Sequence, residues 1–142
     1  MLQRILFVVS ATGESLRAAP IVSELALCTN AQIIALNVVD STVAQRVVTA
    51  TGSTVTDLFV KLEQDGWRYL FDVEDMAKSM GARIVLLQDE GYPEATVTSA
   101  ARRFKVDLVV VPRSRAAGMA QSRIERMAMA LIDRLDCPVM VV

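Results

Sequence analysis

The stretch DLVVVP, Asp107–Pro112, decides the fold of this chain. Its unbroken aliphatic run predicts a strand that is buried on both faces, as the strands of parallel sheets are. A loop with Arg113 and Arg115 follows, and residues 122–135 then show the three- and four-residue apolar spacing of an amphipathic helix. A buried strand that leads through a loop into a helix is the repeating unit of α/β proteins, whose ligands bind at the carboxyl ends of the strands.

The remainder of the chain repeats this unit. Continuous apolar runs predict four further strands, at residues 4–9, 31–39, 82–89 and 138–142. Strands that alternate with helices predict parallel pairing with right-handed crossovers. We therefore expect an α/β fold, a doubly wound five-stranded parallel sheet with helices on both faces.

Three more helices are expected between these strands. The first is capped by Thr12 or Ser15 and runs to about residue 28, with Ile21, Val22 and Leu25 facing the core. The others are predicted at residues 55–80 and 93–104. Residues 40–54 are rich in threonine and serine, which predicts a loop with a short helix at residues 44–48.

The composition limits the class of protein. A length of 142 residues fits one domain, residues 1–142. Hydrophobic residues make up 53% of the chain, but no apolar run reaches the roughly 18 residues that a membrane span needs. The apolar run near the N-terminus is broken by Ser10, Thr12 and Glu14, which argues against a signal peptide. We expect a cytoplasmic protein that does not enter a membrane.

The chain contains no histidine, which excludes Ser-His-Asp catalysis and histidine-ligated metals. Its two cysteines, Cys28 and Cys137, form no CxxC pair and are expected to be small core residues in a reducing compartment. Ser10 has no histidine or nearby lysine to activate it, so a turn residue is expected there and not a nucleophile. These residues predict that the protein is not an enzyme.

Charge is distributed unevenly along the chain. The net charge is −1, yet residues 102–126 carry seven arginines and lysines against two acids. Two interpretations stay open: a solvated face with ion pairs to the acidic helices, or an anion site. The basic segment has no interleaved aromatic residues and the whole chain is slightly acidic, so nucleic acid binding is not expected.

Three further groups of residues have ordinary interpretations. Asp40, Asp89 and Glu90 follow two strands and could bind a hard cation, but solvated loop charges are the preferred interpretation. Trp67 and Tyr69 lie on the long helix and mark either a partner surface or core. The methionines are expected to fill the core: Met76, Met80, Met127, Met129 and Met140.

Four segments in this order resemble the universal stress protein family over essentially the whole chain. They are RILFVVSATGES at the start, ALNVVD at the end of the second strand, GYPEATVTSAARRFKVDLVVV, and the closing CPVMVV. The resemblance implies a five-stranded parallel sheet in the order 3-2-1-4-5. It also implies a small cytoplasmic protein that forms a homodimer, often through the last strand, here Pro138–Val142.

The resemblance also places a nucleotide site, and the chain departs from its pattern. ATP-binding members carry an aspartate after strand one, where this chain has Ser10. They carry Gly-x2-Gly-x9-Gly-Ser/Thr after strand four, where this chain has Pro112, Arg115, Glu125 and Arg126. Glycine-rich loops hold phosphate through close backbone N–H groups, and proline has none. The chain therefore resembles the subclass that lacks the ATP-binding glycine motif, and no cofactor is expected.

The arginines keep an alternative open, because guanidinium groups bind phosphate without glycines. In that case ATP, AMP or a small anion would lie beside the arginine-rich loop after strand four. The positions of the family's nucleotide site in this chain are Ser10, Ala11, Thr12, Val38, Val111, Pro112, Arg113, Arg115 and Arg126.

Two functions remain for the structure to weigh. The first is a non-enzymatic stress-response module that is homodimeric, binds no ATP and acts on a protein partner of unknown identity. The second is a regulatory domain that binds a nucleotide or small anion through the arginine-rich loop. The final strand favours a dimer on physical grounds also, because a short apolar strand at a sheet edge is exposed unless it is paired.

Overall fold

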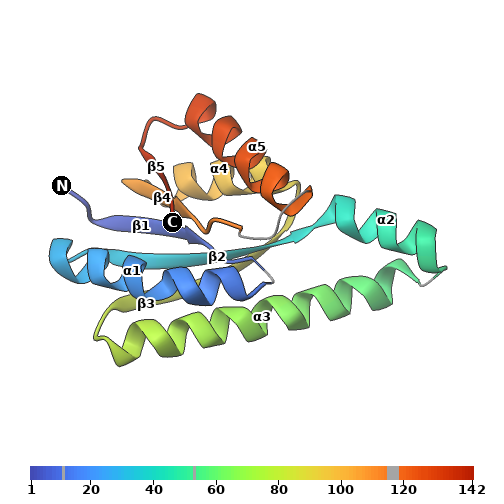
Figure 1. Cartoon of the computed structure of the whole chain (residues 1–142), viewed down its shortest axis with the longest axis horizontal. Helices are drawn as coiled ribbons and strands as arrows, with labels where there is room; N and C mark the ends of the chain where they lie inside the picture. Colours follow the sequence, from blue (N-terminus) through green and yellow to red (C-terminus); the bar gives the residue numbers. More distant parts are fainter. Residues whose placement is uncertain (11, 53, 115–118) are drawn as a thin grey trace.

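The computed structural model describes residues 1–10, 12–52, 54–114 and 119–142. The α/β fold is confirmed: five parallel strands form one sheet in the order β3-β2-β1-β4-β5. Figure 1 shows the helices on both sides of this sheet. In chain order the elements are β1 (Arg4–Val8), α1 (Gly13–Thr29), β2 (Gln32–Asp40), α2 (Ser41–Thr51), α3 (Val55–Ser79), β3 (Arg83–Gly91), α4 (Pro93–Arg103), β4 (Leu108–Val111), α5 (Met119–Arg134) and β5 (Val139–Val141).

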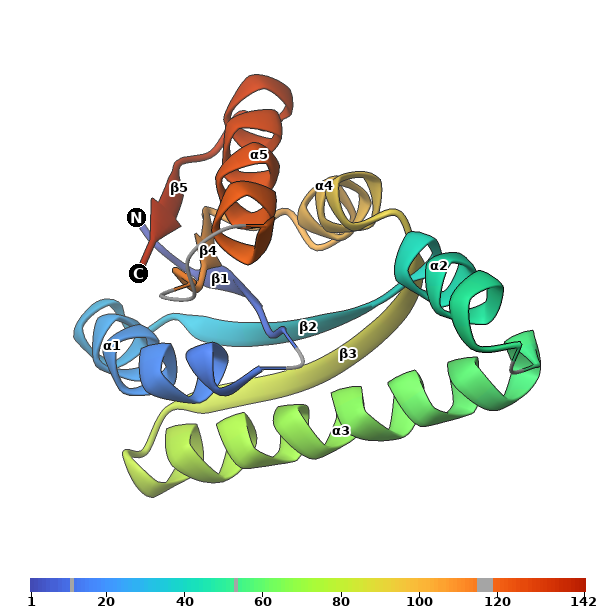
Figure 2. The same cartoon turned by 45° about the vertical axis from the view of Figure 1, so that its right-hand side comes forward.

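The side chains of the central strands alternate between two apolar layers. Ile5 and Phe7 of β1 are buried in the layer beneath α1 and α3, whereas Leu6 and Val8 are buried beneath α4 and α5. Figure 2 shows α1 and α3 on one face of the sheet and α4 and α5 on the other. Both faces are covered, which explains why β1, β2 and β4 are nearly continuous apolar runs.

Residues 40–54 differ from the sequence prediction, because Ser41–Thr51 is a full helix, α2. The Asp40 carboxylate accepts hydrogen bonds from the N–H of Thr42 at 2.9 Å and from its hydroxyl at 2.5 Å, which caps the helix. Gly52, with φ of 69°, ends it in the left-handed conformation. The helix packs against α3 (Figure 1), and this tertiary contact outweighs the low helix propensity of its threonines and valines.

The predicted burial of five residues is also wrong. Ile21 is 52% exposed on the outer face of α1, whereas Val22 and Leu25 do pack against the core. Cys28 is exposed near the end of α1 and is not a core residue. Of the methionines, Met127 fills the core, but Met80, Met129 and Met140 are exposed.

Candidate functional site

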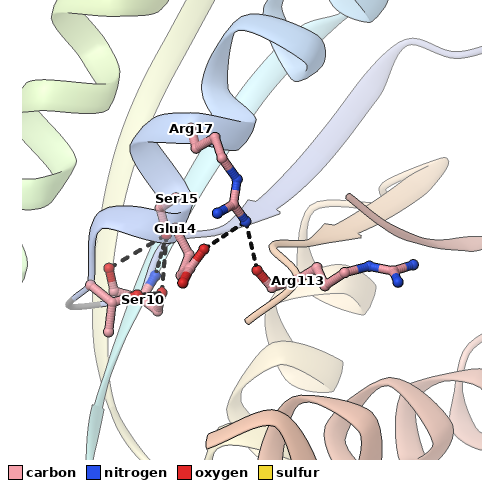
Figure 3. Close-up of polar contacts among 6 residues, drawn as sticks. Ser10, Glu14, Ser15, Arg17 and Arg113 are labelled. Carbon is pink, nitrogen blue, oxygen red and sulfur yellow. Dashed lines mark hydrogen bonds and ion pairs between the residues drawn. The ribbon is translucent and has the colours of Figure 1, made fainter. Parts of the chain in front are cut away.

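The predicted site lies where the strand order reverses, between β1 and β4. In doubly wound sheets, this switch point opens a crevice at the carboxyl ends of the strands. Ser10 and Thr12 follow β1 and lead into α1, while Val111 ends β4 and Pro112 and Arg113 follow it. Figure 3 shows the polar contacts between these two segments.

The turn after β1 is held by hydroxyl groups that bond to one another. The Ser10 hydroxyl lies 2.9 Å from that of Thr12 and 3.1 Å from that of the buried Ser15. The Ser10 N–H donates to the Ser15 hydroxyl at 2.8 Å, which ties the end of β1 to the first turn of α1. This arrangement supports the interpretation of Ser10 as a turn residue.

An arginine of α1 connects this helix to the backbone after β4. The Arg17 Nη2 lies 2.6 Å from the Glu14 carboxylate and donates a hydrogen bond of 2.9 Å to the backbone carbonyl of Arg113 (Figure 3). The Glu14 side chain is only 20% exposed and lies in the first turn of α1, where the helix dipole favours a negative charge. Glu14, Arg17 and the Arg113 carbonyl thus form a polar link from α1 to the end of β4, which we call the α1–β4 link.

Sequence reasoning missed this link. The three-residue spacing of Glu14 and Arg17 is a readable signal for a local ion pair. Nothing in the sequence indicates that Arg17 also reaches a carbonyl 96 positions away.

The backbone after β4 is engaged with the end of the chain. The N–H of Arg113 donates to the Val142 carbonyl at 2.5 Å, and the N–H of Val142 donates to the Val111 carbonyl at 3.0 Å. Pro112 is buried and has no N–H. The first two residues after β4 therefore have no backbone donor left for a phosphate.

A family model that describes the universal stress protein family matches residues 1–142. The chain belongs to the universal stress protein family. A search of curated protein sequences gives no match.

Solved structures of universal stress proteins share the fold at low sequence identity. UspA from Lactobacillus plantarum superposes with a TM-score of 0.80 at 16% identity, covering 99% of this chain and 97% of that chain. A universal stress protein in complex with cAMP gives a TM-score of 0.70 at 20% identity, with 99% and 96% covered. A family protein from Arabidopsis thaliana with AMP bound gives 0.65 at 18% identity, with 99% and 90% covered.

The other predicted positions of the family's nucleotide site lie on β2, on β4 and the loop that follows it, on α5, or outside the described residues. Val38 is half-buried on β2, and Val111 is fully buried on β4. The side chains of Arg113 and Arg126 are exposed, as is that of Glu125 next to Arg126 on α5. Ala11 and Arg115 lie outside the described residues. Of these site residues, Ser10 and Thr12 contact each other through their hydroxyl groups, whereas the Arg113 backbone is tied to α1 through Arg17.

Part of the basic segment is occupied in surface contacts. Arg103 pairs with Asp89 at 3.2 Å and stacks over the Phe104 ring, and Arg102 donates to the Arg134 carbonyl at 3.1 Å. These contacts favour the solvated-face interpretation for this half of the segment.

Asp40 and Asp89, which lie near the carboxyl ends of β2 and β3, have structural partners. Asp40 caps α2 and Asp89 pairs with Arg103, as described above. Within the described ranges, no three histidine, cysteine, aspartate or glutamate side chains gather as a metal site would require. In the same ranges no helix is both long and apolar enough to span a membrane.

Trp67 and Tyr69, for which two interpretations stood open, both pack against the core layer beneath α3. The Trp67 ring also lies 5.6 Å from the ring of Phe71, which is 52% exposed. Trp67 and Tyr69 therefore cover the edge of the core, and Phe71 beside Trp67 remains largely exposed to water.

Proposed function

We propose that this universal stress protein is a non-enzymatic stress-response module that works without ATP, as a homodimer that binds a partner protein. The observation that carries the proposal is that both backbone polar groups of Arg113 are already hydrogen-bonded within the protein. Its N–H is used by Val142 and its carbonyl by Arg17, and the preceding residue is proline. A phosphate cradle needs free backbone N–H groups at this point of the fold.

Electrostatics support the same conclusion. Glu14 and Glu125 place carboxylates on the two helices whose N-terminal ends follow β1 and β4. A carboxylate about 4 Å from a phosphate costs on the order of 4 kcal/mol at an intermediate effective dielectric. Arg17, the cation nearest to Glu14 in the α1–β4 link, is already bonded to Glu14 and to the Arg113 carbonyl and is therefore not free to bind a phosphate.

The surroundings of Ser10 in the described part of the chain support a non-enzymatic role. The chain has no histidine, and the hydroxyl neighbours of Ser10 are those of Thr12 and Ser15. A hydroxyl bonded to other hydroxyls has no base to remove its proton. We expect no turnover of ATP with magnesium, which a phosphate-release assay measures directly.

The exposed edge of the sheet supports the homodimer. β5 pairs only with β4 among the described strands, and its Met140 and Val141 are 38% and 37% exposed. The adjoining α5 exposes Met129 and Ile132 at 61% and 54%. An unpaired edge beside apolar side chains is suited to a twofold contact between copies, here through Pro138–Val142.

A cytoplasmic location is part of the proposal. Cys28 and Cys137 are both free thiols, which is usual for proteins of reducing compartments. Recovery of the protein in the soluble cytosolic fraction of its cells would support this location, and recovery outside that fraction would contradict it.

The experiment that tests ATP independence is calorimetry and thermal denaturation with ATP, AMP, cAMP and inorganic phosphate at millimolar concentration. A ligand present at 100 times its dissociation constant stabilises the folded state by about 2.7 kcal/mol, which raises Tm by several degrees. We expect no heat of binding and no such shift. A clear shift with any of these ligands would overturn the ATP-free form of the proposal.

A second candidate function is a regulatory domain that binds a nucleotide or small anion. It is favoured by the exposed guanidinium of Arg113 at the switch point and by the relatives that hold cAMP and AMP. If a thermal shift is found, Arg113→Gln should remove it, because the glutamine keeps the backbone bonds but lacks the charge. A shift that survives in this variant would place the ligand elsewhere.

A further inference from the structure

The outer edge of β3 is the longest unpaired edge of the sheet. β3 lies at the end of the strand order and pairs with β2 over nine consecutive residues, Arg83–Gly91. Alternate residues of β3 direct their N–H and C=O groups away from β2, toward a side on which the described chain has no further strand. Such a row of donors and acceptors is a template for another strand.

The middle of this edge lacks the charged residues, proline and bulges by which proteins often protect edge strands. The segment Ile84–Gln88 has no charged residue, proline or glycine, and its register with β2 runs without a bulge. The Val85 side chain is 43% exposed and Leu87 is half-buried, so the strand presents apolar groups beside its free backbone. By contrast β5, at the other edge, has only three residues.

The charges of β3 stand at its two ends and are of opposite sign. Arg83 begins the strand and Asp89 lies six residues later, so the two side chains project from the same face. If a second copy pairs antiparallel about Leu86, Arg83 of each copy lies opposite Asp89 of the other. In the same register Val85 lies opposite Leu87. The strand is thus complementary to itself in charge and in apolar pattern.

We propose that β3 is a second self-association surface, at which two copies of this chain pair antiparallel edge to edge about Leu86. The surface goes beyond the proposed β5 dimer and lies at the opposite edge of the sheet. A chain that uses both edges forms assemblies larger than a dimer, because each copy then contacts two others.

Charge reversal tests the register. The background is Met140→Lys, which places a charge on the exposed β5 edge and leaves β3 as the contact to be measured. In this background, sedimentation equilibrium should show a dimer. Arg83→Asp or Asp89→Arg alone should weaken the dimer about tenfold, since each places like charges opposite one another. The double variant Arg83→Asp with Asp89→Arg should restore the dimer to within about threefold of its parent.

Contacts within one chain cannot explain such a restoration. Arg83 donates to the Asn30 carbonyl and Asp89 pairs with Arg103 in the same copy. The double variant restores neither of these contacts, so recovery of the dimer reports the contact between copies. A double variant as weak as either single variant would overturn the register about Leu86.

A matched pair of variants at Val85 tests the edge itself. Val85→Lys places a charge on the edge strand and should abolish association through β3, whereas Val85→Thr keeps a β-branched side chain and should retain it. Equal Tm values for the two variants, measured at a concentration low enough for both to be monomeric, would show that the fold is intact. Association that is equal in the two variants would overturn the proposal.

Val85→Lys and Met140→Lys, introduced singly and together into the wild-type chain, separate this surface from the proposed β5 dimer. If only the β3 surface exists, Val85→Lys yields a monomer and Met140→Lys has no effect. If only the β5 surface exists, Met140→Lys yields a monomer and Val85→Lys has no effect, which overturns the present inference. If both exist, each single variant yields a dimer and the double variant a monomer.

Discussion

At the scale of single residues, Asp107 joins the starts of two neighbouring strands. Its carboxylate Oδ2 accepts the N–H of Gln3 at 2.7 Å and the N–H of Arg4 at 3.0 Å. These backbone hydrogen bonds, with the nearby N-terminus and Arg4, hold the pKa of Asp107 below its ordinary value. The Asp107 side chain thereby links the start of β1 to the start of β4, next to the first backbone hydrogen bonds between the two strands.

The pH dependence of stability follows from this lowered pKa. A carboxyl group whose pKa is lower in the folded state stabilises that state above its ordinary pKa of about 3.9 and loses this contribution as the pH falls through the folded value. We expect Asp107→Asn to lower the free energy of unfolding at pH 7 and to match the wild type well below pH 4. Urea denaturation across this pH range measures the difference. Asp133→Asn, at an exposed carboxylate of α5, is the control for the loss of one negative charge and should change the free energy of unfolding at pH 7 by less than Asp107→Asn.

The two cysteines should differ in reactivity. Cys28 is exposed, whereas burial and the nearby Asp107 and Asp136 raise the pKa of the half-buried Cys137 thiol. Since the thiolate is the reactive form, we expect alkylation of the folded protein at pH 7.5 to modify Cys28 well before Cys137. Mass spectrometry of peptides at short times gives the order, which should disappear in denaturant. Faster labelling of Cys137 in the folded state would contradict its burial.

At the scale of elements, α3 lies close to the sheet over a partly buried polar network centred on Asn37. The Asn37 Nδ2 donates to the Val9 carbonyl at 2.9 Å, and the Gln88 Nε2 donates to the Glu63 carbonyl at 2.9 Å and to the Asn37 Oδ1 at 3.2 Å. Gly66 of α3 lies directly above this network. A Cβ at Gly66 would overlap the Asn37 Oδ1 and come within 2.6 Å of the Gln88 Nε2.

The prediction for this helix is that Gly66→Ala destabilises the protein. Alanine is the better helix former by about 1 kcal/mol, but overpacking a buried site costs about 1–3 kcal/mol and here also displaces hydrogen-bonded groups. We expect a net loss of about 1–2 kcal/mol in the free energy of unfolding, measured in urea. Gly13→Ala is the matched control, because nothing lies within 4 Å of its added Cβ. A neutral Gly66→Ala would mean that the network shifts without loss.

At the scale of the whole molecule, the sheet has two edges and both carry exposed apolar side chains. The proposed β5 dimer leads to a direct prediction for Met140→Lys, which places a charge on the exposed edge strand. We expect this variant to lose the contact through Pro138–Val142 and to show a lower average mass by light scattering at micromolar concentrations. Met140→Leu, which keeps an apolar side chain of similar volume, should behave as the wild type. An average mass that Met140→Lys leaves unchanged would contradict the proposed contact through Pro138–Val142.

Much of the fold could be predicted because its signals are local. The strands appear as apolar runs and α3 as a three- and four-residue period, and Gly81 after α3, with φ of 89°, takes the left-handed conformation expected of a helix-ending glycine. α2 could not be predicted, since its threonines and valines disfavour a helix and its packing against α3 decides the outcome. The exposure of Ile21 and Cys28 is likewise decided by which face of α1 the neighbouring elements cover.

The sequence by itself determined the alternation of strands and helices, the absence of histidine chemistry and the loss of glycines after β4, because each depends on residues a few positions apart. Only the tertiary structure decided that the Arg113 backbone is engaged by Arg17 and Val142, that Gly66 lies over Asn37, and that β3 presents a free edge. These contacts join residues that lie far apart in the chain. They exist because folding brings the elements together, and no local pattern encodes them.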